Sequence, residues 1–198
     1  MPEVEIPKPE ELEEIRNKGF TRRVAITTAV YAVMLAIAAL GGNNAMKDML
    51  LAQQQASDQW AFYQAKVIRE HEYRIQQKRL EVELAERGPG MAPEARQQYE
   101  ALLADFTAET KRYNTEKKDI ENDAKKWEHL RDVNLKRDPY FDFAEVILQI
   151  AIVLSSVSIL AVSRLMYGFS LLLALCGTFL MINGYSLWTM LPFLHGGH

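Results

Sequence analysis

One acidic side chain lies inside an apolar run of this sequence, and it is the first candidate for chemistry. Glu145 is the single charged residue in 143–162. An acid within a membrane-length segment indicates a proton or cation path, which Gln149 and Asn183 would line with it. The alternative is structural: Glu145 lies in the first turn of its run beside Asp142, where the helix macrodipole favours an acid, and Gln149 and Asn183 are groups that hydrogen-bond between helices. We favour the structural interpretation, because a solitary carboxylate makes a poor transporter.

The four histidines and the one cysteine form no pattern typical of a metal or redox site. The histidines are His71, His129, His195 and His198. None lies four residues from another or beside a cysteine, which are spacings that zinc sites use, and solvation accounts better for the tail pair than weak metal binding. The lone Cys176 allows no intramolecular disulfide or Cys-x-x-Cys pair. With no glycine-rich phosphate loop or nucleophile elbow either, the sequence predicts no catalytic residue, metal or cofactor, and a non-enzymatic protein.

The charges of the chain are segregated along its 198 residues. They are dense from Ala45 to Asp138, whereas three other runs approach the roughly 20 apolar residues that cross a bilayer core. The net charge of -3 argues against a nucleic-acid partner. The predicted segments are an acidic tail with a basic end at 1–23, transmembrane helices at 24–42, 143–162 and 168–188, a charged hairpin at 43–138 and a closing transmembrane hairpin over 139–198.

The charged segment reads as two long helices folded back on each other. Gly88–Pro89–Gly90 is the strongest turn signal, so the turn is expected near 88–92. Large residues of the second arm repeat every seven positions, as in a coiled coil. They are Tyr99, Phe106, Tyr113, Ile120 and Trp127, and folding about residue 90 pairs the first four with Val82, Ile75, Ile68 and Ala61. Asp138–Pro139 is expected to end the second arm.

The first span carries a stripe of alanines at alternating spacings of four and three. The stripe consists of Ala25, Ala29, Ala32, Ala36 and Ala39. The same count continues through Gly41–Gly42 and into the charged arm, which favours one unbroken helix. A kink at the two glycines is the alternative, since each costs about 1 kcal/mol in a helix relative to alanine.

Two further patterns indicate packing. In the closing hairpin, a turn at Arg164 would place Ala144, Ala151 and Ser158 opposite small residues of the last helix, namely Gly184, Gly177 and Ser170, and membrane helices approach closely along such stripes. Aromatic residues cluster at the membrane-proximal end of the charged hairpin: Trp60, Phe62, Tyr63 and Trp127. They form either hairpin core with interface anchors or a docking surface. Since Trp60, Phe62 and Tyr63 span more than half a helical turn, at least one is expected to be exposed or covered by another subunit.

Basic residues predict the orientation. The tail carries Lys8, Arg16, Lys18, Arg22 and Arg23, the short loop between the last two spans carries Arg164, and the C-terminal segment carries neither lysine nor arginine. By the positive-inside rule, the tail and Arg164 face the cytoplasm, and the hairpin and C-terminus lie on the other side. The tail is acidic and contains prolines, unlike the basic start of a signal peptide, so we expect a retained anchor.

The block Gly41–Gln64, with its GGNN motif, and the SDQWAFYQAK stretch that reaches Lys66 resemble a bacterial membrane family known as domain of unknown function 4337. The likeness extends to the layout of one span, a charged helical segment and two closing spans. It implies a bacterial inner-membrane protein, with the hairpin and C-terminus in the periplasm if the orientation holds. It implies no activity, ligand or catalytic residue.

Together these patterns predict an all-α membrane protein, with three transmembrane helices and a long antiparallel coiled-coil hairpin between the first and second. The function we expect is non-enzymatic: self-association or scaffolding of a larger membrane complex. The alanine stripe and the aromatic cluster would contact other copies or a membrane-protein partner, and the spans would contact lipids. The rival is a subunit of an oligomeric channel or transporter, in which Glu145, Gln149 and Asn183 line a path.

Overall fold

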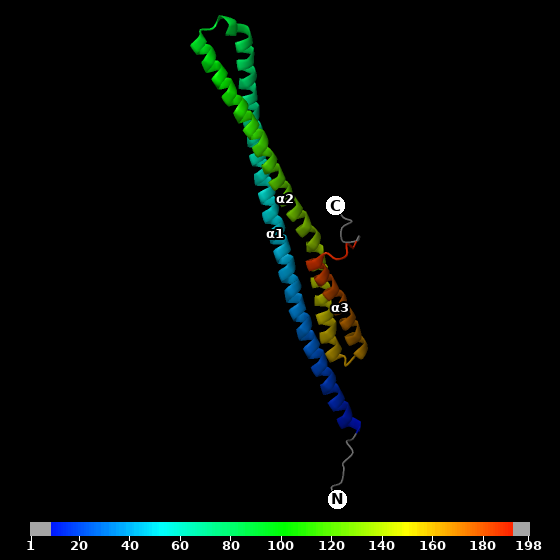
Figure 1. Cartoon of the computed structure of the whole chain (residues 1–198). Coiled ribbons are helices and arrows are strands. Elements are labelled where there is room, and N and C mark those ends of the chain that lie inside the picture. Colours follow the sequence, from blue (N-terminus) through cyan, green and yellow to red (C-terminus); the bar gives the residue numbers. More distant parts are fainter. Residues whose placement is uncertain (1–8, 192–198) are drawn as a thin grey trace. The chain divides into compact units, whose positions relative to one another are not determined.

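The computed structural model of the protein describes residues 9–191, and nearly all of them lie in helices. The elements are α1 (Pro9–Arg87), a short 3₁₀ helix η1 (Gly88–Gly90), α2 (Pro93–Leu160) and α3 (Arg164–Ser186) (Figure 1). No strand occurs in this range, so the predicted all-α class is confirmed. The first eight residues of the acidic tail, and His195 and His198, lie outside it.

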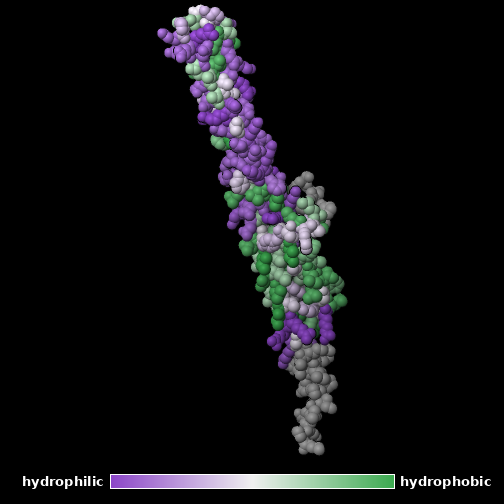
Figure 2. All heavy atoms as spheres, in the orientation of Figure 1, coloured by the Kyte–Doolittle hydropathy of each residue, from purple (hydrophilic) through white to green (hydrophobic). Residues whose placement is uncertain are grey.

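The chain forms two compact units. The three-helix unit comprises Met1–Asp48 and Val133–His198, and the hairpin unit comprises Met49–Asp132. Apolar residues cover the visible face of the first unit and hydrophilic residues most of the second (Figure 2). Each of the three α-helices contains a stretch apolar and long enough to cross a membrane.

Helix α1 runs through Gly41 and Gly42 without a break, as the unbroken repeat predicts. Its inward face follows a seven-residue series that lies one position before the alanine stripe. The buried members are Val24, Tyr31, Ala38, Ala45 and Ala52. The alanine stripe is therefore not what packs within the chain: Ala39 is half-buried, and the other four alanines are exposed.

The glycines in α1 allow an aromatic ring to approach its backbone. Phe141 of α2 is 1% exposed. A Cβ added to Gly41 would lie 2.4 Å from the Phe141 ring, and one added to Gly184 of α3 would lie 3.0 Å from it. Gly42 faces the same side chain, with 3.2 Å between an added Cβ and the Cβ of Phe141. Three glycines on two helices thus make room for the side chain of one phenylalanine.

The expected helix end at Asp138–Pro139 is wrong, because α2 continues through Pro139 to Leu160. A proline inside a helix loses one backbone hydrogen bond and strains the preceding turn, at about 3 kcal/mol. The two residues that follow, Tyr140 and Phe141, are almost completely buried. Their burial in the three-helix unit offsets the local cost, an influence of tertiary packing that the dipeptide alone does not show.

The stripes of small residues in α2 and α3 are buried, but they meet about one helical turn away from the predicted pairing. An added Cβ on Gly177 would lie 2.9 Å from Leu148 and 3.3 Å from the backbone oxygen of Ala144, whereas Ala151 was the expected neighbour. The cause is the turn. Helix α2 ends at Leu160 and α3 starts at Arg164, with Val162 at a positive φ of 47°. The chain therefore reverses about two residues before Arg164, which shifts every pair.

In the hairpin unit, α1 and α2 are antiparallel neighbours. Hydrogen bonds join Gln53 to Arg131, Trp60 to Glu128 and Lys66 to Glu116. The residue numbers of these partners rise along α1 and fall along α2. Higher up, Tyr73 stacks on Tyr113 with ring centroids 5.5 Å apart and meets Phe106 edge-on at 5.7 Å. All five members of the large-residue repeat in α2 are buried or half-buried, as predicted: Tyr99, Phe106, Tyr113, Ile120 and Trp127.

The partners predicted for that repeat on α1 are wrong. Ile68, Ile75 and Val82 are exposed by 60%, 58% and 56%, and Ala61 is exposed as well. The inward positions are instead a half-buried row, Tyr63, Lys66, Tyr73, Gln77 and Leu84, together with the buried Glu70 and Leu80. Tyr73 fits between two aromatic rings of α2, and Glu70 meets a lysine, so this face of α1 makes more specific contacts than the β-branched row does.

Candidate interaction surfaces

The aromatic cluster of the hairpin unit is partly core and partly surface. Trp60 is half-buried and donates its indole N–H to Glu128 Oε1 at 2.9 Å. Tyr63 packs edge-on against Trp60, with ring centroids 5.5 Å apart, and Trp127 is half-buried. Phe62 is 51% exposed. At least one aromatic had to lie outside, and Phe62 is the one that the fold leaves there.

Lys66 links this cluster to the next turn of the hairpin. Its ammonium lies 5.2 Å from the centre of the Phe62 ring and 5.0 Å from that of Tyr113. It also donates a hydrogen bond of 2.5 Å to Glu116 Oε2, which holds the pKa of the Glu116 carboxyl below its usual range. Phe62 is therefore a surface group beside a lysine whose charge is already neutralised within the hairpin.

A buried carboxylate lies near the middle of the hairpin. Glu70 is 2% exposed and accepts hydrogen bonds from Lys117 and Arg74, with Asn114 Nδ2 at 3.4 Å. Burial by itself would raise the pKa of this carboxyl, but the hydrogen bond and charge of Lys117 and the charge of Arg74 outweigh burial, and its pKa is lowered. A buried ion pair of this kind serves better to select one pairing of two helices than to add net stability.

Glu70→Gln is expected to destabilise the hairpin by about 2 kcal/mol, because it removes the charge from hydrogen bonds to a lysine and an arginine. A carboxyl whose pKa is lowered on folding stabilises the fold above its unfolded pKa, near 4.3, and loses that contribution as pH falls through the folded pKa. The thermal midpoint of the wild type should fall below about pH 5, and the midpoint of the variant should fall less over the same range. Circular dichroism melts across pH measure both effects.

The matched control is Glu72→Gln, an exposed neighbour on the same helix. Its melting profile should follow the wild type within about 0.5 kcal/mol. Equal profiles for Glu70→Gln and Glu72→Gln would contradict the role given to the buried carboxylate.

The alanine stripe lines a groove of the three-helix unit. Ala25, Ala29 and Ala32 form one wall and Ser156, Ile159 and Leu160 of α2 the other, enclosing about 550 Å³. Beneath it, Thr28 and Ser155 share a hydrogen bond of 2.6 Å. The hydroxyls of the floor are thus satisfied within the chain, and the walls are apolar except for Ser156, whose hydroxyl donates to the Ile152 carbonyl. This surface admits a close-packed apolar element and offers little for a polar ligand.

The three polar residues considered for a membrane path are differently engaged. Glu145 is half-buried, with its carboxylate close to the backbone of Gly42. Gln149 is exposed. Asn183 is buried, and its amide bonds to Thr189 rather than across to another helix: Nδ2 donates to the carbonyl at 2.7 Å, and Oδ1 accepts from the backbone N–H at 2.9 Å. Of the three, Asn183 is thus engaged within its own chain.

Sequence reasoning missed the polar clasp that Asn183 shares with Tyr140. The hydroxyl of Tyr140 donates to the Thr189 carbonyl at 2.9 Å and accepts from Leu191 N–H at 2.9 Å. Tyr140 is fully buried, and a buried hydroxyl needs such partners. The one signal in the sequence was a tyrosine directly after Pro139, a position that equally suits an aromatic residue at the membrane interface. The clasp fixes the segment after α3 and leaves no polar group for a ligand.

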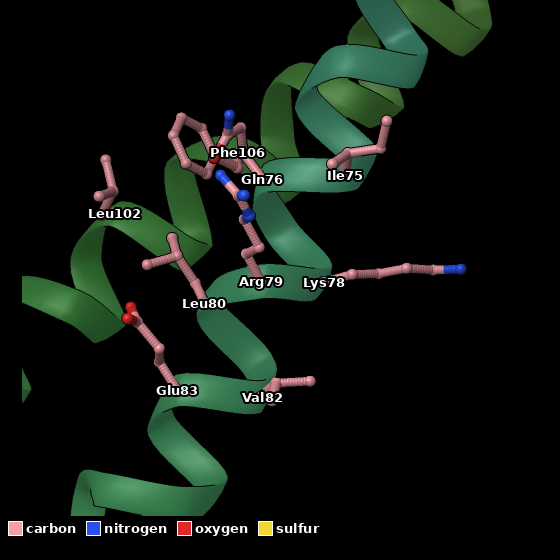
Figure 3. A pocket seen from close by; sticks show the side chains of 9 residues that line it. All are labelled: Ile75, Gln76, Lys78, Arg79, Leu80, Val82, Glu83, Leu102 and Phe106. Atoms are coloured by element: carbon pink, nitrogen blue, oxygen red, sulfur yellow. The ribbon is translucent and has the colours of Figure 1, made fainter.

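A second groove, which the sequence gave no reason to expect, lies near the turn of the hairpin. It has a volume of about 800 Å³. Five apolar residues line it, Ile75, Leu80, Val82, Leu102 and Phe106, together with four polar or charged ones, Gln76, Lys78, Arg79 and Glu83. Figure 3 shows Leu80 directed toward Leu102, while Ile75 and Val82 project from the other side of α1. Among the described residues, no three histidine, cysteine or acidic side chains gather where they would hold a metal. The groove near the alanine stripe is the more apolar of the two, since no charged residue lines it.

A known protein family covers most of the chain. Residues 20–187 match the family described as Domain of unknown function (DUF4337). The chain belongs to the DUF4337 family. The match covers nearly all of the described helices, so the family unit includes all three apolar stretches and the whole hairpin. No curated protein and no solved structure matches the chain. Membership of DUF4337 assigns no activity to the chain. The proposed function rests on the surfaces described above.

Proposed function

We propose that this DUF4337 protein is a non-enzymatic, membrane-anchored scaffold whose helices assemble with those of other copies. Its three apolar helices would lie in the bacterial inner membrane in contact with lipids, and the hairpin unit would pair as an antiparallel coiled coil. The observation that carries the proposal is the exposure of four of the five stripe alanines of α1, three of which line a groove shared with α2.

The small residues of the other two membrane helices are already used. Ala144 and Ala151 of α2 and Gly177 of α3 are buried, and Gly177 lies against α2. Helices in lipid associate through close packing of small residues, because lipid supplies no hydrophobic drive between them. The exposed alanines of α1 are the corresponding face without a partner.

A second copy of α1 is the occupant that fits this face. The alanines recur at the four-three spacing that two helices need to interlock, and a stripe of one residue type is complementary to itself about a two-fold axis. The groove holds no charged wall that would select a different partner. Phe62 of the hairpin unit, exposed beside Lys66, would add a second contact between neighbouring copies.

Replacing Ala32 and Ala36 together with leucine should weaken the assembly about tenfold, because overpacking a close contact costs about 1–3 kcal/mol. The measurement is particle mass against protein concentration in a mild detergent. The control is Val33→Leu with Ile37→Leu, which enlarges or reshapes exposed residues of the same helix beside the stripe. If both double variants dissociate equally, the alanine face is not the contact.

The proposed orientation places the basic tail and Arg164 in the cytoplasm and the turn of the hairpin unit in the periplasm. A cysteine introduced by Gly90→Cys, in a chain with Cys176→Ser, should react with a membrane-impermeant maleimide in intact spheroplasts. Gly90 is exposed in η1, so access to the thiol is not limited by the fold. Labelling that occurs only after lysis would reverse the orientation.

A further inference from the structure

A small pocket lies in the three-helix unit, where the apolar stretches of its helices end. Its volume is about 200 Å³, and Gly41 of α1, Phe141 of α2 and Tyr185 of α3 line one part of it. These residues are packed together, since a Cβ added to Gly41 would lie 2.4 Å from the Phe141 ring and 2.8 Å from the Tyr185 hydroxyl. Gly41 lies at the end of the apolar run of α1, and Phe141 comes just before that of α2. In the proposed membrane arrangement, the pocket therefore lies where the hydrocarbon core meets the headgroups.

The rest of the pocket is polar. Asn44 and Asp48 of α1 and Asn134 and Arg137 of α2 line it. The Nε atom of Arg137 is shielded from solvent and has no hydrogen-bond acceptor within the described chain, an arrangement that costs free energy until an acceptor is supplied. Neither Arg137 nor the exposed Asp48 is paired with another described side chain. The pocket thus offers one positive and one negative group without a counter-ion from the protein.

These two charges match a headgroup that carries both signs. Arginine suits a phosphate, which it can hold through two parallel hydrogen bonds, and a carboxylate accepts hydrogen bonds from a primary ammonium. Asp48 is the only acid among the lining residues, and a site for a simple anion would gain nothing from it. Phosphoethanolamine carries a phosphate and a primary ammonium on a short linker. Phosphocholine matches less well, because its methylated nitrogen has no N–H to donate.

Apolar surface adjoins the pocket. The Tyr185 hydroxyl donates to the Ile37 carbonyl of α1 at 3.2 Å, so the end of α3 lies beside this part of α1. Ile37 and Ile182, which lies about one turn before Tyr185, are exposed by 42% and 52%. The acyl chains of a lipid whose headgroup occupies the pocket would cover these side chains, whereas a free phosphate compound would not. The apolar surface therefore favours a lipid as the source of the headgroup.

We propose that this pocket binds the headgroup of a phosphatidylethanolamine, with the phosphate on Arg137 and the ammonium on Asp48. The amide of Asn44 would donate a further hydrogen bond to the phosphate. The inference rests on the membrane insertion given in the proposed function, and not on self-association. It makes this boundary a site for one kind of lipid, beyond the general contact that every membrane helix has with the bilayer.

Native mass spectrometry of the full-length protein in mild detergent tests the site, with dioleoyl phosphatidylethanolamine, phosphatidylglycerol and phosphatidylcholine as probes. The wild type should bind the ethanolamine lipid about tenfold more tightly than the other two. Arg137→Gln should weaken this binding about tenfold, because charge-assisted hydrogen bonds to the phosphate are lost. The matched control is Lys136→Gln, which removes an exposed positive charge outside the pocket and should bind as the wild type does.

Asp48→Asn gives a readout that a loss of folding would not. It should lower the affinity for phosphatidylethanolamine about tenfold without lowering the affinity for phosphatidylglycerol, because only the ammonium loses its partner. Circular dichroism spectra equal to that of the wild type would show that the helices of both pocket variants are intact.

Three results would overturn the proposal. Equal affinity of the wild type for the three lipids would mean general contact with the bilayer only. Equal binding by Arg137→Gln and Lys136→Gln would place the lipid elsewhere on the protein. Displacement of the lipid by an equimolar amount of free phosphoethanolamine would identify a soluble ligand as the occupant.

Alkaline carbonate washing of membranes tests the proposed function separately. The wild-type protein should stay in the membrane pellet. Its release would contradict membrane anchoring and this site with it, whereas a protein that stays in the pellet and shows no preference among the lipids contradicts the site alone.

Discussion

Phe141→Ala is expected to cost about 3–5 kcal/mol of stability, the usual range for removing a fully buried phenylalanine. The ring is 1% exposed and touches the backbones of α1 and α3 at Gly41 and Gly184. It also meets Tyr185 edge-on, with centroids 4.9 Å apart. Removing the ring leaves a cavity between two helix backbones, and the small residues beside it cannot fill that space. Unfolding by SDS titrated into mild-detergent micelles, followed by circular dichroism, gives the free-energy difference.

Phe143→Ala provides the matched control on the same helix. Phe143 is 47% exposed, so its loss should cost well under half as much, since the cost of truncation grows with the cavity it leaves. Similar losses for the two variants would mean that Phe141 is not the packing centre of the three-helix unit.

Gly41→Ala is the second substitution with a large expected effect. The added methyl would lie 2.4 Å from the Phe141 ring and 2.8 Å from the Tyr185 hydroxyl. Phe141 has little room to move, because its side chain is 1% exposed and the same ring atoms lie close to Gly184, 3.0 Å from a Cβ added there. Overpacking of this kind costs about 1–3 kcal/mol, and a tertiary contact at 2.4 Å belongs at the upper end. The measurement is the same SDS titration, with a net loss of about 2 kcal/mol expected after the gain in helix propensity.

Gly19→Ala is its control, because no atom lies within 4 Å of the added methyl. In a helix this change should be neutral or stabilise the protein by up to about 1 kcal/mol. The two variants should therefore shift stability in opposite directions. Stabilisation by Gly41→Ala would show that the close approach of Phe141 to α1 does not occur.

The element types followed from the sequence, because they depend on local signals. Gly88–Pro89–Gly90 marks the turn between α1 and α2 whatever surrounds it, and the unbroken four-three repeat carries α1 through Gly41 and Gly42. Pro139 shows where local signals fail. Its cost to the helix is local, whereas the burial of Tyr140 and Phe141 that offsets it depends on two other helices.

Choosing the inward face of α1 was harder, because two seven-residue rows compete in the hairpin unit. Ile68, Ile75 and Val82 are more apolar than Glu70, Tyr73 and Gln77, and hydrophobicity alone selects the first row. The fold selects the second, since Tyr73 fills the space between Phe106 and Tyr113 and Glu70 pairs with Lys117. The aromatic and ionic complements lie on another helix, so they are invisible in the sequence of α1.

The same reasoning bears on the candidate contacts. The alanine stripe was recognisable from its spacing, and the structure places four of its five members on the surface. The exposure of Ile68, Ile75 and Val82 was not predictable, because it follows from the contacts that another face of α1 makes with α2. Asn183 was misjudged for the converse reason: its partner Thr189 lies in a segment after α3 whose path the sequence did not indicate.

Self-association is the central claim, and particle mass tests it most directly. The measurement is the mass of wild-type protein, by light scattering coupled to size-exclusion chromatography, in several mild detergents and in lipid nanodiscs. The account predicts a particle of at least two chains, each of 22.7 kDa, which shifts toward the single-chain mass when Ala32 and Ala36 are replaced with leucine. A wild-type protein that has the mass of one chain in every detergent and in nanodiscs would contradict it.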